Sequence, residues 1–264
     1  MTVELLLKEI LNDRGYRGQA VDMRRLPARD AVYGNPQVEL PPQLKSALAQ
    51  MDIEQLYSHQ ATALDTIRRG ENAVIVTSTA SGKTLCYNLP VLEMLLQDPS
   101  ARALYVFPTK ALAQDQLQGL LRWQSLVPSL SMRAGTYDGD TPRDLRRQLR
   151  ESGNVILTNP DMLHSGILPH HTKWMRLFEN LKYVVIDELH IYRGVFGSHV
   201  ANVLRRLERI CKFYGAKPQF ICTSATIANP KEHGTTLLGR PVTVIDKNGA
   251  PRGQKDIVFY NPPV

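Results

Sequence analysis

Short runs of β-branched and other apolar residues recur along the chain, and they constrain its fold more than any other feature. Stretches with helical character separate them, at about residues 83–97, 109–125, 142–151, 173–180 and 196–214. Strands that are apolar on both faces and alternate with helices are typical of a parallel sheet covered on both sides. We therefore predict an α/β fold with a doubly wound, mostly parallel sheet of about seven strands. The clearest runs are residues 73–78, 102–107, 154–159, 182–187, 219–224 and 242–246.

The residues that follow these runs indicate a candidate site, because ligands of such folds bind beyond the carboxyl ends of the strands. Polar residues cluster there in three places, at residues 77–84, 187–190 and 224–226. Parallel strands end at the same edge of a sheet, so we expect the three clusters to lie near one another.

The first cluster, "TSTASGKT", lies between a predicted strand and a predicted helix. A loop of small residues before a helix presents backbone N–H groups to a phosphate, here from Thr79, Ala80, Ser81 and Gly82. In such a loop the lysine, Lys83, reaches the terminal phosphates and the hydroxyl of Thr84 binds Mg²⁺. The usual pattern begins with glycine where this chain has Thr77, so the sequence predicts a variant phosphate loop. A small hydroxyl residue fits that position if its φ angle is ordinary.

The second cluster is Asp187-Glu188-Leu189-His190, at the end of an apolar strand. Burying two adjacent carboxylates is costly, so packing alone does not explain them; the alternative is a solvated strand end. Beside a bound Mg²⁺-nucleotide, Asp187 is expected to bind the metal, and Glu188 to orient and deprotonate the attacking water. His190 is placed to carry a contact onward from this site.

Six segments resemble, in order, motifs Q, I, Ia, Ib, II and III of the superfamily 2 helicases: "LYSHQ", "TSTASGKT", "PTKALAQDQ", "TNPDMLH", "DELH" and "SAT". They span residues 56–226, and position 77 is commonly a small non-glycine residue in that superfamily. The segments "YDGDTP" (137–142) and 191–210 further resemble the Hrq-like branch, which includes DNA helicases of the mitomycin repair factor A type. The Lhr-like helicases are the alternative branch.

The resemblance implies a RecA-like P-loop NTPase that uses ATP and Mg²⁺ and acts on single-stranded nucleic acid. It favours DNA over RNA, a role in DNA repair and, by analogy, translocation from 3′ to 5′. Gln60 would recognise the adenine through its amide group. Tyr57 would pack on the base, although a core tyrosine is an equal alternative.

The resemblance also suggests which residues contact nucleic acid. Thr109, Lys110 and Thr158 lie at strand ends where the family binds the sugar-phosphate backbone. Gln114 and Arg193 are further candidates, and an ordinary surface position is the alternative for each. In motif III, Ser224 and Thr226 would couple the nucleotide site to the nucleic-acid face through His190 and Asp187.

The bulk composition fits this interpretation. Lys and Arg total 32 against 25 Asp and Glu, a net charge of +7, which favours an anionic partner, although a merely basic protein is equally consistent with charge alone. The three cysteines show no CxxC spacing and lie among apolar residues, so we expect buried, inert thiols. We find no apolar run of membrane-spanning length and no secretory signal, and we expect a bacterial cytoplasmic or nucleoid location.

The chain divides into three predicted regions: a helical and extended lead-in at 1–50, a RecA-like ATP-binding domain at 51–246, and a hinge at 247–264. Helicases of this superfamily close two RecA-like domains around ATP, and the second supplies an arginine finger. We find no second set of motifs here, so we expect a second RecA-like domain and a C-terminal region to act as partners. The chain alone is expected to hydrolyse ATP slowly or not at all.

Two other functions remain open from the sequence. A non-catalytic nucleic-acid-binding or scaffold module would keep this fold without turnover, although the intact Lys83, Asp187 and Glu188 argue against degeneration. A P-loop kinase or small-molecule ATPase is the third, and the ordered motifs and the basic charge count against it.

Overall fold

The computed structural model describes residues 3–261 of the chain. These residues form two compact units. Tyr33–Gly249 make the larger unit, and the segments before and after it, within residues 1–32 and 250–264, make the smaller one. The three sequence clusters all lie in the larger unit.

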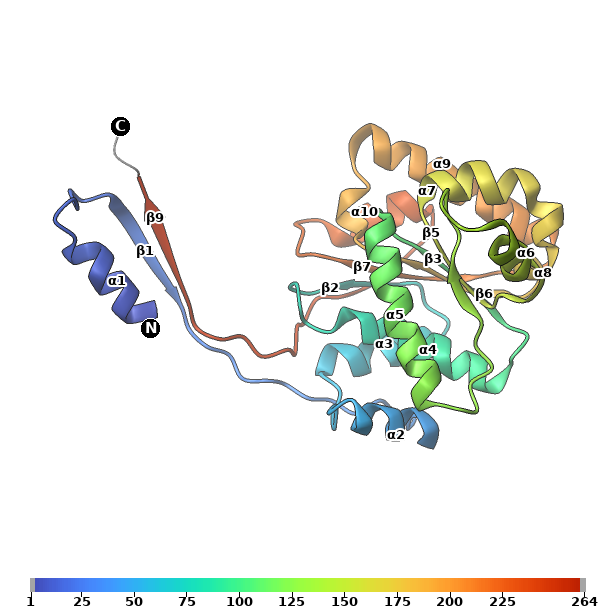
Figure 1. The fold of residues 1–264 in the computed structure, drawn as a ribbon, viewed down its shortest axis with the longest axis horizontal. Coiled ribbons are helices and arrows are strands. Elements are labelled where there is room, and N and C mark those ends of the chain that lie inside the picture. The colour runs from blue at the N-terminus through green and yellow to red at the C-terminus, as the bar shows by residue number, and fades with distance from the viewer. Residues whose placement is uncertain (1–2, 262–264) are drawn as a thin grey trace. The chain divides into compact units, whose positions relative to one another are not determined.

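A seven-stranded sheet forms the centre of the larger unit (Figure 1). Its strand order is β4-β5-β3-β6-β7-β2-β8, and every pairing within it is parallel. The sheet confirms the predicted α/β fold, and its one unpredicted strand, β4, is only three residues long. The strands are β2 (Ala73–Val76), β3 (Arg102–Val106), β4 (Ala134–Thr136), β5 (Val155–Thr158), β6 (Leu181–Ile186), β7 (Gln219–Ser224) and β8 (Thr243–Ile245).

Helices connect the strands, and they lie close to the predicted ranges. Among the described residues, no helix combines the length and apolar character that crossing a bilayer requires. The α-helices of this unit are α2 (Pro42–Gln50), α3 (Ser58–Arg68), α4 (Lys83–Gln97), α5 (Lys110–Leu126), α6 (Arg143–Ser152), α7 (Pro160–Met162), α8 (Met175–Glu179), α9 (Gly194–Phe213) and α10 (Pro230–Leu238). A π-helical turn, η1 (Leu163–Ile167), and two 3₁₀ segments, η2 (Leu168–Trp174) and η3 (Leu189–Ile191), complete them.

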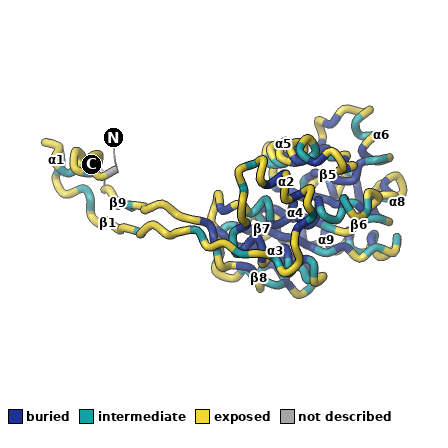
Figure 2. Tube along the Cα trace, turned by 90° about the horizontal axis from the view of Figure 1, so that it is seen from below, coloured by how far each residue is buried: buried dark blue, intermediate teal, exposed yellow. Residues whose placement is uncertain are grey.

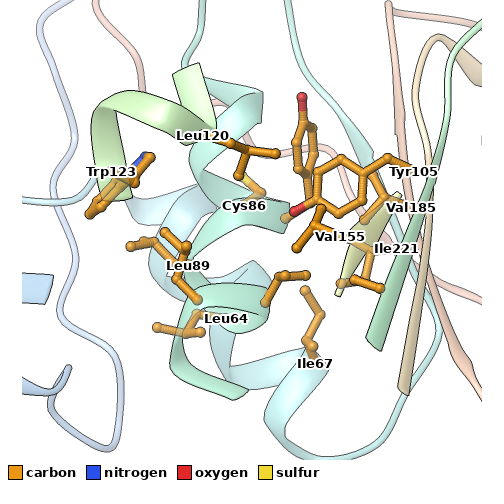
Figure 3. Close-up of a cluster of buried hydrophobic side chains, with 14 of the residues drawn as sticks. Leu64, Ile67, Cys86, Leu89, Tyr105, Leu120, Trp123, Val155, Val185 and Ile221 are labelled. Carbon is orange, nitrogen blue, oxygen red and sulfur yellow. The ribbon is translucent and has the colours of Figure 1, made fainter. Parts of the chain in front are cut away.

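Two hydrophobic cores cover the two faces of the sheet. On β3, Tyr105 packs into one core, whereas its neighbours Leu104 and Val106 pack into the other. The first core lies between one face of the sheet and helices α2 to α5. Leu89 of α4 and Trp123 of α5 belong to it (Figure 3). This alternation explains why the strands are apolar at every position: each successive side chain enters a different core. Figure 2 shows the buried positions concentrated in the strands and the adjoining helix faces.

The smaller unit contains α1 (Val3–Asn12) and an antiparallel ribbon of β1 (Ala20–Leu26) and β9 (Lys255–Tyr260). An ion pair of 2.6 Å between Arg25 Nε and Asp256 Oδ1 crosses the ribbon. That hydrogen bond holds the pKa of Asp256 below its ordinary value. The helix was predicted, but the strand pairing was not.

Candidate functional site

Strand register brings the polar clusters together at one edge of the sheet. Val76, the last residue of β2, pairs with Ser224 of β7, and Cys222 of β7 pairs with Ile186 of β6. Ile186 in turn pairs with Val106 at the end of β3. The phosphate loop, the DELH segment and the SAT segment therefore leave neighbouring strands at the same level, as the sequence predicted.

The phosphate loop closes on itself through two hydroxyl groups. Oγ1 of Thr77 and Oγ of Ser81 lie 2.6 Å apart, and both side chains are buried. The left-handed backbone conformation falls at Ala80, with φ of 59°, and at Gly82, with φ of 78°. Because that conformation does not fall at position 77, threonine fits where the usual loop has glycine, and its hydroxyl binds the far end of the loop.

Lys83 begins α4 and its side chain folds back over the loop. Its ammonium group donates to the carbonyl oxygens of Thr77 at 3.0 Å and Ser78 at 3.1 Å. From the other side, Nδ2 of Asn248 donates to Oγ of Ser78 at 2.8 Å. The lysine charge is thus held at the mouth of the loop, where terminal phosphates would be bound.

Gln60 connects the start of α3 to the phosphate loop. Its Oε1 accepts from the backbone N–H of Tyr57 at 2.9 Å, and its Nε2 donates to the carbonyl of Gly82 at 3.0 Å. A Cβ on residue 82 would lie 2.5 Å from that Nε2, and the backbone there has a φ of 78°, so a larger residue would displace the amide and strain the loop. One lone pair and one amide proton of Gln60 stay available, which matches the donor and acceptor of an adenine N6/N7 edge.

A pocket of about 700 Å³ opens beside this amide. Its wall includes Tyr57 and Gln60 together with Gly82 and Leu85 at the start of α4. Tyr33 lines it as well and stacks on Tyr57, with ring centroids 5.6 Å apart. The volume and the aromatic wall suit a nucleobase, and no sequence signal pointed to Tyr33.

Asp187 is fixed at the end of β6 by two hydrogen bonds to one carboxylate oxygen. Oδ1 accepts from the hydroxyl of Thr223 and from the backbone N–H of Glu188 at 2.9 Å. The side chain is buried apart from 8% of its surface. Its second oxygen, Oδ2, remains for another ligand. The sequence did not single out Thr223; the pairing of Ile186 with Cys222 places it directly beside Asp187.

Glu188 and His190 meet just beyond the strand. Oε2 of Glu188 lies 3.1 Å from Nδ1 of His190, and the same nitrogen lies 3.2 Å from the backbone N–H of Ala225. Glu188 adopts a left-handed conformation with φ of 53°, which is costly for a residue with a Cβ; strained residues of this kind cluster at functional sites. The DELH and SAT segments are therefore in direct contact.

The contact between the DELH and SAT segments does not use the side chains of Ser224 and Thr226 that the sequence suggested. The hydroxyl of Ser224 donates to the carbonyl of Ala225 at 2.8 Å, and Thr226 is exposed. The links to Asp187 and His190 come instead from the Thr223 hydroxyl and the Ala225 backbone. A backbone donor leaves no signal in a sequence, which is why Ala225 was not identified.

Mg²⁺ is compatible with this donor set. Among the described residues, no group of three or more His, Cys, Asp or Glu side chains could hold a metal ion. Mg²⁺ in nucleotide sites takes only one or two protein ligands and completes its shell with phosphate and water. Oδ2 of Asp187 and the half-buried hydroxyl of Thr84 supply such a set.

The predicted nucleic-acid residues lie at the neighbouring strand ends. Thr109 caps α5 by accepting from the N–H of Leu112 at 3.3 Å, and Nζ of Lys110 forms an exposed ion pair of 2.5 Å with Asp140. Arg193 is exposed at the start of α9, and its side chain makes no hydrogen bond or ion pair with the described residues.

Two other candidates are engaged within the protein. The buried hydroxyl of Thr158 donates to the carbonyl of Tyr137 at 2.8 Å, and Nε2 of Gln114 donates to Oγ1 of Thr136 at 3.0 Å. Both bonds attach β4 and the turn after it to the neighbouring elements. Lys110 and Arg193 therefore present their charge outward, whereas Thr158 and Gln114 support the backbone beside them.

Comparison with known proteins agrees with this geometry. The family model for DEAD/DEAH box helicases matches residues 57–233. The uncharacterized ATP-dependent helicase YprA of Bacillus subtilis is 54% identical over 260 residues, which cover 98% of this chain and 34% of that protein. The ATP-dependent helicase HRQ1 of Saccharomyces cerevisiae is 43% identical over 267 residues, covering 100% of this chain and 24% of that protein.

Solved structures give the same result. A crystal structure of the DUF1998 helicase MrfA bound to DNA has 53% identity and a TM-score of 0.94, covering 100% of this chain and 37% of that one. A DEAD-box helicase bound to single-stranded RNA, at 15% identity and a TM-score of 0.67, shares the fold alone. This chain spans about a third of the length of YprA and MrfA. The predicted placement in the Hrq-like branch is confirmed, and the chain belongs to the DEAD/DEAH box helicase family.

Proposed function

We propose that this chain is the ATP-binding motor domain of a DNA helicase that couples Mg²⁺-ATP hydrolysis to 3′–5′ translocation on single strands. The observation that carries the proposal is a pair of direct contacts at one sheet edge, one between Gln60 and the phosphate loop and one between the SAT and DELH segments. Gln60 binds the phosphate loop at Gly82, and Thr223 and Ala225 bind the DELH segment at Asp187 and His190. A nucleotide bound to the phosphate loop would lie at the same sheet edge as the DELH and SAT segments.

The nucleotide roles follow from the positions of the side chains. Gln60 and the aromatic wall of the pocket select and hold the adenine, and Lys83 exchanges its two carbonyl partners for phosphate oxygens. Glu188 orients the attacking water and accepts its proton. Asp187 and Thr84 would hold Mg²⁺, which supplies charge neutralisation at the phosphates. Its left-handed backbone directs Glu188 away from the strand, toward His190.

We propose that single-stranded DNA binds at the ends of the neighbouring strands. Lys110 and Arg193 supply exposed positive charge, and the backbone around Thr109 and Thr158 supplies polar groups for phosphate contacts. The net charge of +7 agrees with an anionic partner. DNA is favoured over RNA because MrfA, at 53% identity, was solved bound to DNA. Ser224 and Thr226 lie in the segment that we propose couples the two sites.

The wider setting is also part of the proposal. Because the chain spans 34% of YprA, we infer that a second RecA-like domain and a C-terminal region complete the motor in the full-length protein. Residues 51–246 carry the ATP-binding function, residues 1–50 lead into it, and residues 247–264 act as the hinge. We place the protein in the bacterial cytoplasm or nucleoid and its work in DNA repair.

ATP hydrolysis by the full-length gene product tests the proposal. We expect single-stranded DNA to raise turnover at least tenfold and RNA of the same length to raise it less. The matched control is Lys83→Ala, which should remove hydrolysis in both cases. A full-length protein that binds DNA but never hydrolyses ATP would instead be a scaffold module. Stimulation by a small metabolite, and not by DNA, would indicate a small-molecule ATPase.

A further inference from the structure

A groove separate from the nucleotide pocket opens between α9 and the segment that follows β5. Its volume is about 390 Å³. One wall begins at Pro160, two residues after Thr158 at the end of β5, and the other lies on α9, which begins directly after Arg193. Both walls of this α7–α9 groove therefore start beside residues of the proposed DNA-binding edge. Its lining includes Pro160, Asp161 and His164 on one side and Phe196, Arg206 and Arg209 on the other.

Phe196 brings an aromatic ring to this groove in the first turn of α9. It is 41% exposed, and the ring of the buried Tyr192 packs against it with ring centroids 5.7 Å apart. The next residue, Gly197, lies so close to Tyr192 that a Cβ there would come within 2.3 Å of the Tyr192 carbonyl oxygen. The first turn of α9 is thus packed tightly on Tyr192, which supports the Phe196 ring from one side. A supported ring with open surface is what an unpaired nucleobase stacks on.

Two arginines line the same groove further along α9. Nη1 of Arg206 donates to the carbonyl oxygen of His164 at 3.4 Å, across the groove. Within residues 3–261, neither Arg206 nor Arg209 forms an ion pair, although both line the groove with Asp161, the one carboxylate of its lining. The lining therefore has an excess of permanent positive charge, which complements an anionic ligand. An apolar partner helix would leave both guanidinium groups without a counter-charge.

The spacing along α9 places the ring and the charges on one helix face. Phe196, Val203 and Arg206 all line the groove and follow one another at seven and three positions, close to whole helical turns. At a rise of 1.5 Å per residue, the distance along the helix from Phe196 to Arg209 is about 20 Å. Neighbouring phosphates of one B-DNA strand lie about 3.4 Å apart along the axis, so this length accommodates several nucleotides. An aromatic ring at one end of a positively charged groove is typical of proteins that bind single-stranded nucleic acid.

We propose that the α7–α9 groove binds single-stranded DNA beyond the sheet edge: an unpaired base stacks on Phe196, and Arg206 and Arg209 bind the phosphates that follow it. This inference rests on the proposed DNA-binding function. It adds a contact to a base, whereas the contacts proposed at the strand ends are to the sugar-phosphate backbone. Because every base has a π face, such stacking tolerates any sequence. None of these three residues belongs to the six motif segments of the sequence.

Two DNA probes that differ only in their bases test the inference. Fluorescence anisotropy with the full-length protein compares an oligothymidylate of about 12 nucleotides with a strand of equal length made of abasic deoxyribose phosphates. Phe196→Leu is expected to weaken binding of the oligothymidylate about fivefold, the lower end of the effect of losing one stacked base. Its affinity for the abasic strand should stay within twofold of wild type, because the phosphate contacts are unchanged. Phe196→Tyr keeps an aromatic ring and should stay within twofold for both probes.

The same helix offers matched controls for the ring and for the charge. Phe213, also on α9, is 77% exposed and lies outside the groove lining, so Phe213→Leu should leave both affinities unchanged. Arg206→Gln should lower the slope of log affinity against log salt by about 1, since one phosphate contact is lost. Arg205, its neighbour in sequence, is exposed but does not line the groove, and Arg205→Gln should leave the slope unchanged.

The contrary outcomes are distinguishable. Phe196→Leu that binds both probes like wild type, or that weakens both equally, would overturn the inference. In the first case the groove would serve another partner, such as a protein segment. If the Phe196 variants do not fold, the Arg206→Gln and Arg205→Gln pair decides, and equal salt slopes in the two would overturn the inference. A wild-type protein that binds neither probe would contradict the proposed DNA-binding function itself.

Discussion

The hydroxyl of Thr223 donates a hydrogen bond to Oδ1 of Asp187 across the β6–β7 pair. Together with the backbone N–H of Glu188, it occupies one oxygen of the carboxylate and leaves the other for a ligand. Thr223 is fully buried, so the bond is sheltered from water. The residue just before the SAT segment therefore sets the orientation of the proposed metal-binding carboxylate.

Replacing this hydroxyl should impair turnover. We expect Thr223→Val, which keeps the shape of the side chain, to lower DNA-stimulated ATP turnover about tenfold, because a hydrogen bond to a charged group is lost. Thr223→Ser keeps the donor and should retain most activity. Steady-state hydrolysis by the full-length protein, measured beside thermal unfolding, separates this effect from a loss of fold. Equal activity in the Val and Ser variants would contradict the role of the hydroxyl.

Glu188→Gln should separate binding from hydrolysis. The amide cannot accept the proton of the attacking water, so we expect turnover to fall by about 10²–10⁴-fold. ATP affinity should stay close to wild type, because Gln60 and Lys83 are untouched. Single-turnover hydrolysis and equilibrium nucleotide binding measure the two properties. Unchanged turnover would refute the role given to Glu188.

Gln60→Ala should weaken ATP binding for two reasons. The amide that would pair with adenine is removed, and so is the bond that joins it to Gly82 of the phosphate loop. We expect the ATP affinity to fall by about tenfold or more, with the preference for ATP over GTP largely lost. Competition between the two nucleotides against a labelled analogue reports both. A variant that binds weakly but still prefers ATP would assign base selection to other groups.

The ion pair between Lys110 and Asp140 predicts opposite effects on DNA binding. Lys110→Ala removes a phosphate contact, so affinity should fall and the slope of log affinity against log salt should decrease by about 1. Asp140→Asn frees the lysine and should tighten binding about two- to threefold at low salt. Both are measured by fluorescence anisotropy with single-stranded DNA across salt concentrations. Identical slopes in Lys110→Ala and wild type would exclude a contact from Lys110.

The cysteines should react only after unfolding. Burial raises the pKa of the Cys86 thiol from its ordinary 9.0 to about 12, and burial likewise raises that of Cys211 to about 12. Because the folded pKa lies above the unfolded value, the protonated thiols stabilise the fold fully below pH 9. That contribution is lost as the pH rises toward 12. At pH 8 we expect a thiol reagent to label Cys86, Cys211 and Cys222 only in denaturant; labelling in the native state would contradict their burial.

Much of the sheet was predictable because each of its buried strands has its own apolar signal. Residues 102–106 and 181–186 are apolar almost throughout, and they form β3 and β6 close to the expected bounds. β4 was missed because its Ala-Gly-Thr sequence is too short and too weakly apolar to stand out. The β1–β9 ribbon was missed because most of its side chains are exposed, so neither strand carries a burial pattern.

Only the site residues that belong to sequence motifs could be predicted. Lys83, Asp187 and Glu188 lie together at the sheet edge because local sequence places each of them just after a strand. Contacts that depend on strand order could not be predicted, because the sequence alone does not reveal that β6 lies beside β7. Thr223 was therefore overlooked in favour of Ser224.

The β1–β9 ribbon has a consequence for the order in which the chain folds. Arg25 and Asp256, which pair across it, are separated by 231 positions. During synthesis, β1 is made before the residues of the seven-stranded sheet, and it has no partner strand until β9 has been made. Contacts this distant in sequence carry the greatest cost of loop closure and form late. The sheet can assemble before β9 is made, so the ribbon closes only after the sheet-forming residues have been synthesised.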